Sequence, residues 1–356
     1  MLFGEVALQL KLVTVDQVEE GLKVQDQNRA GGGGRTLGAI LHDLGHLDLV
    51  QVTRILREMG QPPDRCQPVP GYDIEEIIGR GMSGAVYRGL KPVVNWRVAI
   101  KVRAPRCPGD DPEGKRFIAE ARLGAQLSHP NIVRLIDAGQ TNDYLYHVQE
   151  YVDGESLQRK MRTLGIVPEP LCISVGVQMC SALEHARQHG VVHRDVKPAN
   201  ILISRKGEAK LCDLGLAKDT RRSTMRTAEG VLLGSPYYIA PEYAREGKFD
   251  WRSDLYSLGV ALYHSATGIV PFEGKSALEI LEKAVSRPPT EPRTVNPQIS
   301  RAFSAALLRL LEKRPDDRYQ SAAEAAAAFA RAREHPDEIP TDGALRRLLG
   351  KITGKK

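Results

Sequence analysis

Apolar residues recur at helical spacing in two stretches of the first 60 residues. They are Val15, Val18 and Leu22 in the first stretch and Leu49, Val52 and Leu56 in the second. A spacing of three to four residues places such side chains on one face of a helix. The stretches align at an offset of 34 residues, so that Gly4 corresponds to Gly38. Residues 1–60 are therefore predicted to form a small all-α domain of two helix–turn–helix units.

The pattern changes at a proline-rich segment, residues 61–71, which we interpret as a linker. Proline removes a backbone donor and disfavours helix in the residue before it. From Tyr72 the chain shows alternating, strand-like runs first and helical spacing later. This order predicts an α+β domain over residues 72–334, rich in strands over 72–151 and helical over 152–334. Residues 335–356 form a basic C-terminal tail.

Composition narrows the class of protein. Lys and Arg total 50 against 44 Asp and Glu, and the basic residues are not gathered in one segment, so we expect no nucleic-acid surface. The five cysteines are scattered without a CxxC pair, which argues against disulfides and zinc and favours a reducing cytoplasm. We expect no secretory signal and no membrane span, because no run of about 18 apolar residues occurs.

A glycine-rich segment joins two of the strand-like runs. Gly79, Gly81 and Gly84 lack the Cβ that would keep backbone amides away from phosphate oxygens. A strand follows the glycines rather than a helix, so a dinucleotide fingerprint is excluded, although a plain hairpin explains the segment about as well. If the segment does hold a nucleotide, Val86 would cover one face of the adenine ring.

Two charged residues follow at positions that suit phosphate binding. Lys101 lies on an alternating run, Arg97 to Val102, and can hold the α and β phosphates if a carboxylate holds the lysine. Glu120, on a predicted helix, is the candidate for that carboxylate. A solvated surface charge is the alternative for either residue taken alone.

Most of the candidate catalytic and metal-binding residues lie near residue 195 in the sequence. Asp195 can accept the proton of an attacking hydroxyl, and Lys197 can neutralise the γ-phosphoryl oxygens. Asn200 and Asp213 carry oxygen atoms of the kind that ligate magnesium. Lys and Asn at two and five residues after His-Arg-Asp make chance a poor explanation for the string.

Taken together, these motifs strongly resemble the signature set of protein kinases. Their sequences are most similar to those of the bacterial serine/threonine kinases of the eukaryotic type. The matching set comprises Gly79-x-Gly81-x-x-Gly84-x-Val86, Val98-Ala-Ile-Lys101, Glu120, His193-Arg-Asp195-x-Lys-Pro-x-Asn200, Asp213-x-Gly215 and Ala240-Pro-Glu242. The resemblance implies a two-lobed kinase fold, with a β-rich N-lobe (72–151) and a helical C-lobe (152–334). It also implies ATP and Mg²⁺ as cofactors, protein substrates and a role in bacterial signal transduction.

The resemblance also assigns individual residues. Asp195, Lys197, Lys101, Glu120 and Ser235 are implied as catalytic, the Ser235 hydroxyl bridging Asp195 and Lys197. Contacts to ATP are implied for Ile78, Gly79, Gly81, Gly84, Val86, Ala99, Lys101, Gln149, Glu150 and Val152, and metal binding for Asn200 and Asp213. Lys197 implies serine and threonine rather than tyrosine as acceptors. A pseudokinase scaffold is the alternative, and the complete catalytic set argues against it.

Regulation is predicted in two places. Thr227, and after it Thr224, are the expected autophosphorylation sites on the activation loop, where a phosphate would pair with Arg194. Residues 1–60 somewhat resemble the N-terminal domains of bacterial secretion and pilus ATPases, some of which bind cyclic dinucleotides. The first unit has no arginine corresponding to Arg35 before its Leu2-Phe3-Gly4, so a module that docks a partner protein or forms a homodimer is favoured over one that binds a cyclic dinucleotide.

Overall fold

A computed structural model describes residues 2–30, 34–62, 66–81, 84–103, 112–141, 143–213 and 236–338. The chain divides into two compact units. The first comprises residues 1–125 and 134–151, and the second comprises residues 126–133 and 152–356. In the part of the chain that the structure describes, no helix is both long enough and apolar enough to cross a membrane.

The first unit begins with helices. They are α1 (Phe3–Gln9), α2 (Val15–Ala30), α3 (Leu37–Asp43) and α4 (Leu49–Glu58), so two fall in each predicted helix–turn–helix unit. Asp48 caps α4: its side chain accepts from the backbone N–H of Gln51, and the Gln51 side chain accepts from the N–H of Asp48. Each contact satisfies a donor that the start of a helix leaves without a partner, which is why α4 starts here.

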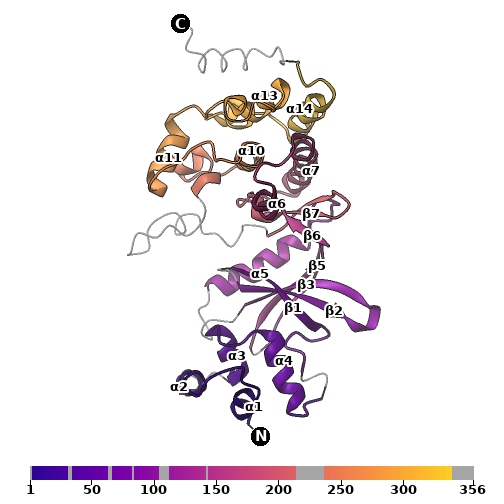
Figure 1. The fold of residues 1–356 in the computed structure, drawn as a ribbon, viewed down its shortest axis with the longest axis vertical. Helices are drawn as coiled ribbons and strands as arrows, with labels where there is room; N and C mark the ends of the chain where they lie inside the picture. The colour runs from indigo at the N-terminus through magenta and orange to yellow at the C-terminus, as the bar shows by residue number, and fades with distance from the viewer. Residues whose placement is uncertain are drawn as a thin grey trace. The chain divides into compact units, whose positions relative to one another are not determined.

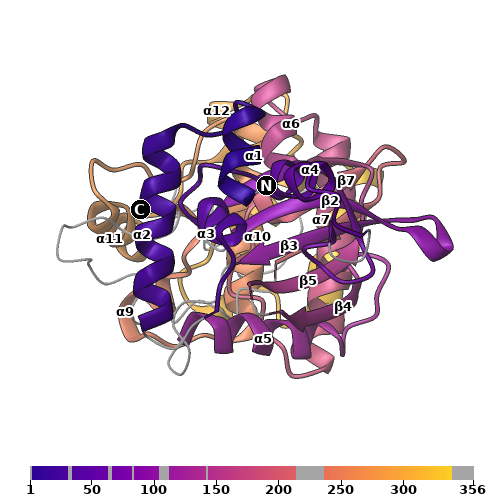
Figure 2. The same ribbon diagram turned by 90° about the horizontal axis from the view of Figure 1, so that it is seen from below.

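An antiparallel sheet of five strands follows among the described residues, in the order β1-β2-β3-β5-β4. Its strands are β1 (Asp73–Gly81), β2 (Gly84–Lys91), β3 (Trp96–Arg103), β4 (Leu135–Gln140) and β5 (Leu145–Glu150), with the short 3₁₀ helix η2 (Pro92–Val94) between β2 and β3. Helix α5 (Pro112–Gly124) lies on one side of the sheet, and α3 and α4 lie on the other (Figure 1). Figure 2 shows the same unit from the side of α1 and α2.

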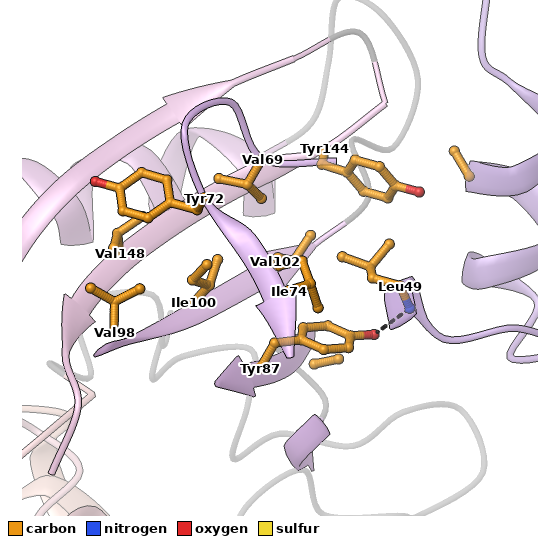
Figure 3. Packing of buried hydrophobic residues seen from close by; sticks show 12 residues of the cluster. Leu49, Val69, Tyr72, Ile74, Tyr87, Val98, Ile100, Val102, Tyr144 and Val148 are labelled. Atoms are coloured by element: carbon orange, nitrogen blue, oxygen red, sulfur yellow. Dashed lines mark hydrogen bonds between the residues drawn. The ribbon is translucent and has the colours of Figure 1, made fainter. Parts of the chain in front are cut away.

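The sheet has its hydrophobic core on the side of α3 and α4. The core residues are Ala39, Leu49, Val69, Tyr72, Ile74, Ala85, Tyr87, Val98, Ile100, Val102, Tyr144 and Val148 (Figure 3). Two of them, Ala39 and Leu49, come from the N-terminal helices. Because side chains alternate across a strand, the neighbours of these residues on β2, β3 and β5 face the opposite side, where α5 lies.

The second unit is mainly helical, with a small antiparallel sheet of β6 (Gly154–Ser156), β7 (Ile201–Ser204) and β8 (Ala209–Leu211). Its helices are α6 (Leu157–Leu164), α7 (Glu169–Gln188), α9 (Pro241–Glu246), α10 (Trp251–Thr267), α11 (Ala277–Ser286), α12 (Pro292–Val295), α13 (Arg301–Leu310) and α14 (Ala322–Glu334). The 3₁₀ helices are η3 (Pro198–Asn200), η5 (Pro236–Tyr238) and η6 (Pro315–Asp317). Helix α10 is buried from Ser253 to Thr267 except at His264, and it forms the centre of this unit.

The predicted fold class is confirmed: a β-sheet part and a helical part form an α+β protein in which helices precede the strands. The predicted domain limits, by contrast, remain predictions. The N-terminal helices belong to the same compact unit as the five-stranded sheet, and they supply part of its core.

Candidate active site

The candidate catalytic residues of the second unit lie close together. Asp195 Oδ2 lies 2.8 Å from Lys197 Nζ, and it also accepts a hydrogen bond of 2.9 Å from Asn200 Nδ2. The same Asn200 amide donates to the backbone carbonyl of Asp195 at 2.8 Å. Proline begins η3 directly after Lys197, and this tight turn brings Asn200 back onto Asp195. The sequence spacing therefore gives one hydrogen-bonded cluster.

Asp254 holds the backbone that leads into this cluster. Its Oδ2 accepts from the N–H of His193 at 2.7 Å, and its Oδ1 accepts from the N–H of Arg194 at 2.8 Å. Burial in α10 raises the pKa of Asp254 to about 7, although the two backbone N–H groups act in the opposite direction. Arg194 has φ of +66°, a left-handed conformation that costs a residue with a side chain about 1–3 kcal/mol. The carboxylate stabilises the segment in this conformation.

A second set of contacts joins the segment to Asp213. The N–H of Cys212 donates to the carbonyl of Asn200 at 2.9 Å, and His193 Nε2 lies 3.1 Å from the carbonyl of Cys212. Asp213 also has a positive φ, +55°, at the end of the described stretch. These bonds place the backbones of Asn200 and Cys212 side by side, directly before Asp213. His193 connects these segments structurally, as we expect for a residue that is 1% exposed.

The candidate nucleotide-binding residues of the first unit share one face of the sheet. Lys101 on β3 pairs in register with Val86 on β2, and Ala99 pairs with Gln149 on β5. Each of these four residues stands next to a core residue on its own strand. Because successive side chains of a strand point to opposite faces, all four lie on the face opposite α3 and α4. Lys101 is 6% exposed, and the stem of its side chain is therefore covered.

Helix α5 covers the same face. Directly opposite Lys101 on β5 is His147, whose Nε2 lies 2.6 Å from the carbonyl of Phe117 in α5. The rings of Phe117 and His147 stack with their centroids 3.7 Å apart. Glu120 follows one turn later on α5, but its side chain lies outside what the structure describes.

The glycine-rich hairpin joins β1 and β2. Gly79 pairs with Val86, and Gly81 pairs with Gly84. Gly84 has φ of +123°, and a Cβ there would lie 2.2 Å from the carbonyl oxygen of Val102, so only glycine fits. Ile78 is 44% exposed, on the side away from the core. Glu150 is the last residue of β5, and Val152 is the first residue of the longer segment of the second unit.

Three predicted positions lie outside the described residues. They are Ser235, Thr224 and Thr227.

Sequence reasoning also missed one feature of the first unit, the contact between the N-terminal helices and Tyr87 on β2. Tyr87 Oη lies 3.0 Å from His42 Nε2 and accepts from the N–H of Leu49 at 3.2 Å. Tyr87 fits the alternation of apolar and polar residues along β2 as any core residue would. The sequence pattern therefore does not indicate a partner 45 residues away.

Comparison with known proteins gives a consistent picture. A family model described as the protein kinase domain matches residues 72–329. The serine/threonine-protein kinase PknB of Mycolicibacterium smegmatis is 38% identical over 270 residues, which is 74% of this chain and 43% of that protein. A probable serine/threonine-protein kinase of Clostridium perfringens is 35% identical over 266 residues, covering 75% of this chain and 39% of that protein. This chain thus spans less than half the length of these curated relatives.

Solved structures agree with these relatives. The kinase domain of PknI from Mycobacterium tuberculosis has a TM-score of 0.58 at 28% sequence identity, and the match covers 73% of this chain and 95% of that domain. A structure of Rad53 in complex with AMP-PNP has a TM-score of 0.61 at 26% identity, covering 72% of this chain and 64% of that one. The predicted resemblance is therefore confirmed, and this chain belongs to the protein kinase family.

Proposed function

We propose that this protein is a serine/threonine protein kinase that transfers the γ-phosphoryl group of ATP to hydroxyl groups of proteins. The observation that carries the proposal is the cluster of Asp195, Lys197 and Asn200, joined by hydrogen bonds of 2.8 to 2.9 Å. A carboxylate, an ammonium and an amide in contact suit a reaction in which a hydroxyl loses a proton near a polyanion. The names of the relatives PknB and PknI, and the AMP-PNP bound to Rad53, support the same activity.

Each residue of the cluster has a proposed role. Asp195 orients the substrate hydroxyl and accepts its proton as the new O–P bond forms. Lys197 balances the charge that develops on the transferred group, and its contact with Asp195 fixes its position. Lys101 on the sheet holds the α and β phosphates. Most of the acceleration comes from such positioning and charge neutralisation, since the protein makes no covalent bond to the phosphoryl group.

The donor set also fits magnesium. Asn200 uses Nδ2 to hold Asp195, so Oδ1 is its atom for ligation, and Asp213 offers a carboxylate. Amide and carboxylate oxygens are the ligands that Mg²⁺ prefers. Bound magnesium would neutralise phosphate charge.

Further assignments belong to this proposal. Thr227 and Thr224 are the proposed autophosphorylation sites, and Ser235 is proposed to bridge Asp195 and Lys197. The chain is proposed to act in the cytoplasm.

We favour the view that residues 1–60 bind a partner protein or a second copy of the chain rather than a cyclic dinucleotide. Arg35 already contacts Asp43 and the carbonyl of Asp143, and a nucleotide ligand would have to displace these contacts.

Phosphoryl transfer from labelled ATP to a generic basic protein, followed by phosphoamino-acid analysis, tests the proposal. We expect label on serine and threonine, dependent on Mg²⁺. Label on tyrosine alone would overturn the substrate class. Nucleotide binding without transfer would favour a scaffold.

A further inference from the structure

The N-terminal helices and the kinase sheet share one hydrophobic core. Ala39 of α3 and Leu49 of α4 are fully buried among the core residues of the sheet, and Leu49 contacts Tyr87 of β2 (Figure 3). Tyr87 itself has no exposed surface. The helices are therefore part of the folded N-lobe rather than a module that is only tethered to it.

The hydroxyl of Tyr87 is the polar centre of this contact. Its oxygen accepts from the N–H of Leu49 at 3.2 Å, in the first turn of α4, where no carbonyl within the helix is available (Figure 3). Burial raises the pKa of Tyr87 to about 12, so the hydroxyl keeps its hydrogen at neutral pH. The same hydroxyl shares a hydrogen bond with His42 Nε2 of α3, 3.0 Å away. One hydroxyl thus links both helices to β2.

A second set of contacts joins the N-terminal helices to the sheet beside β5, which neighbours β3 on the side opposite β2. Asp143, in the turn between β4 and β5, accepts from the N–H and from the hydroxyl of Thr36, both at 2.9 Å. Arg35 donates to the carbonyl of Asp143 at 3.3 Å and pairs with Asp43 at 2.5 Å. In the sheet order β1-β2-β3-β5-β4, strand β3 lies between the two anchored parts.

Strand β3, which lies between these two sets of contacts, contains Lys101. Lys101 pairs with Val86, which directly precedes Tyr87 on β2, and both face away from the helices. A shift or rotation of β2 at Tyr87 therefore moves Val86 and the end of the glycine-rich hairpin on the opposite face. The contacts that fix Tyr87 also fix these residues.

We propose that α3 and α4 brace the nucleotide-binding face of the sheet and that Tyr87 is the positioning residue through which they act. This inference rests on the proposed function, because it assigns the opposite face of the sheet to ATP. Tyr87 touches no substrate in this scheme. It acts through Val86 and Lys101.

The test compares two tyrosine-to-phenylalanine variants of the full chain. Tyr87→Phe removes the hydroxyl that both helices hold. Tyr72→Phe is the matched control, because Tyr72 lies in the same core but its hydroxyl donates to Asp137 within the sheet, at 3.3 Å. Affinity is measured with an ATP analogue that carries a fluorescent N-methylanthraniloyl group, and KM and kcat are measured for ATP. All measurements are made at a temperature where circular dichroism shows every variant folded.

We expect Tyr87→Phe to weaken nucleotide affinity and raise KM by about tenfold, as for other misplaced binding groups. Tyr72→Phe should leave both values near those of the wild type, even if it lowers Tm as much. His42→Gln, whose amide can hydrogen-bond the Tyr87 hydroxyl in place of Nε2, should retain affinity, whereas His42→Leu should not. Equal affinities for Tyr87→Phe and the wild type, or equal losses in both phenylalanine variants, would overturn the proposal.

The same experiment separates this inference from the proposed function. Wild-type protein that binds the analogue but transfers no phosphoryl group contradicts the kinase activity, and the affinities of the variants still decide the role of Tyr87. Wild-type protein that binds no nucleotide overturns both.

Discussion

The Nζ atom of Lys197 lies 2.8 Å from Oδ2 of Asp195, the same oxygen that accepts the amide hydrogen bond of Asn200. Hydrogen bonds to an ionised carboxylate are stronger than those between neutral groups, and two of them fix its rotation. The proposed base is therefore oriented by its own loop, through residues two and five positions later in the chain.

Asn200→Ala should reduce kcat about 10²-fold, because preorganised polar contacts at an active site are commonly worth that much. Asn131→Ala is the matched control. Asn131 also donates twice through Nδ2, to Gln178 and to the carbonyl of Ala209, but it does not contact Asp195. Steady-state kinetics and thermal melts of both variants check the prediction. A similar fall in kcat for both would mean that Asn200 is only structural.

Asp254→Asn should lower the free energy of unfolding by about 1–3 kcal/mol and reduce kcat as well. An asparagine offers one acceptor oxygen where the carboxylate offers two, so the N–H of His193 or Arg194 loses its partner. Asp250→Asn serves as a control at the start of the same helix, since asparagine also caps helices well. Urea titrations and kinetics of the two variants give the comparison. Normal kcat in Asp254→Asn would show that the loop needs no such anchor.

The motifs around residue 195 could be predicted from sequence because their partners lie within a few residues, where spacing alone fixes geometry. The start of α4 at Asp48 was also predictable, from the local capping pattern. The contacts of Tyr87 with His42 and of Thr36 with Asp143 could not be predicted, because they join residues far apart in sequence. Nothing local distinguishes Tyr87 from an ordinary core tyrosine. The activation-loop sites lie outside the described residues and stay predictions.

Arg318→Met should destabilise the protein by about 3–5 kcal/mol, because it leaves the largely covered carboxylate of Glu242, 13% exposed, without its guanidinium partner. Arg318 has no exposed surface, and its guanidinium holds both oxygens of Glu242 at 2.8 and 2.6 Å. Denaturant unfolding measures the loss. Arg314→Ala is the control, because its contacts with Asp316 and Asp317 span 3.9 to 4.0 Å at the surface and should be worth at most about 1 kcal/mol. The double variant Arg318→Met with Glu242→Gln should recover part of the loss, and no recovery would contradict the electrostatic explanation.

Stability should depend on pH through Lys313. Burial lowers the pKa of Lys313 to about 7 from its ordinary 10.5, so the folded state favours the neutral amine. The unfolded chain binds more protons than the folded chain between these values, and stability should therefore fall as pH decreases from about 10 to 7 and level off below. The Tm difference between wild type and Lys313→Met, measured across this range, isolates the effect. Lys248→Met, at an exposed lysine, is the control, and a difference that does not change with pH would contradict the prediction.

The most direct test of the central claim is phosphoryl transfer by wild type and Asp195→Asn. Each purified protein is incubated with Mg²⁺ and γ-labelled ATP, and binding of the fluorescent analogue is measured in parallel. We predict label on substrate protein with the wild type, at least about 10³-fold less with Asp195→Asn, and similar nucleotide affinity for both. Transfer by Asp195→Asn at a rate near that of the wild type would contradict the role of Asp195 and the mechanism built on it.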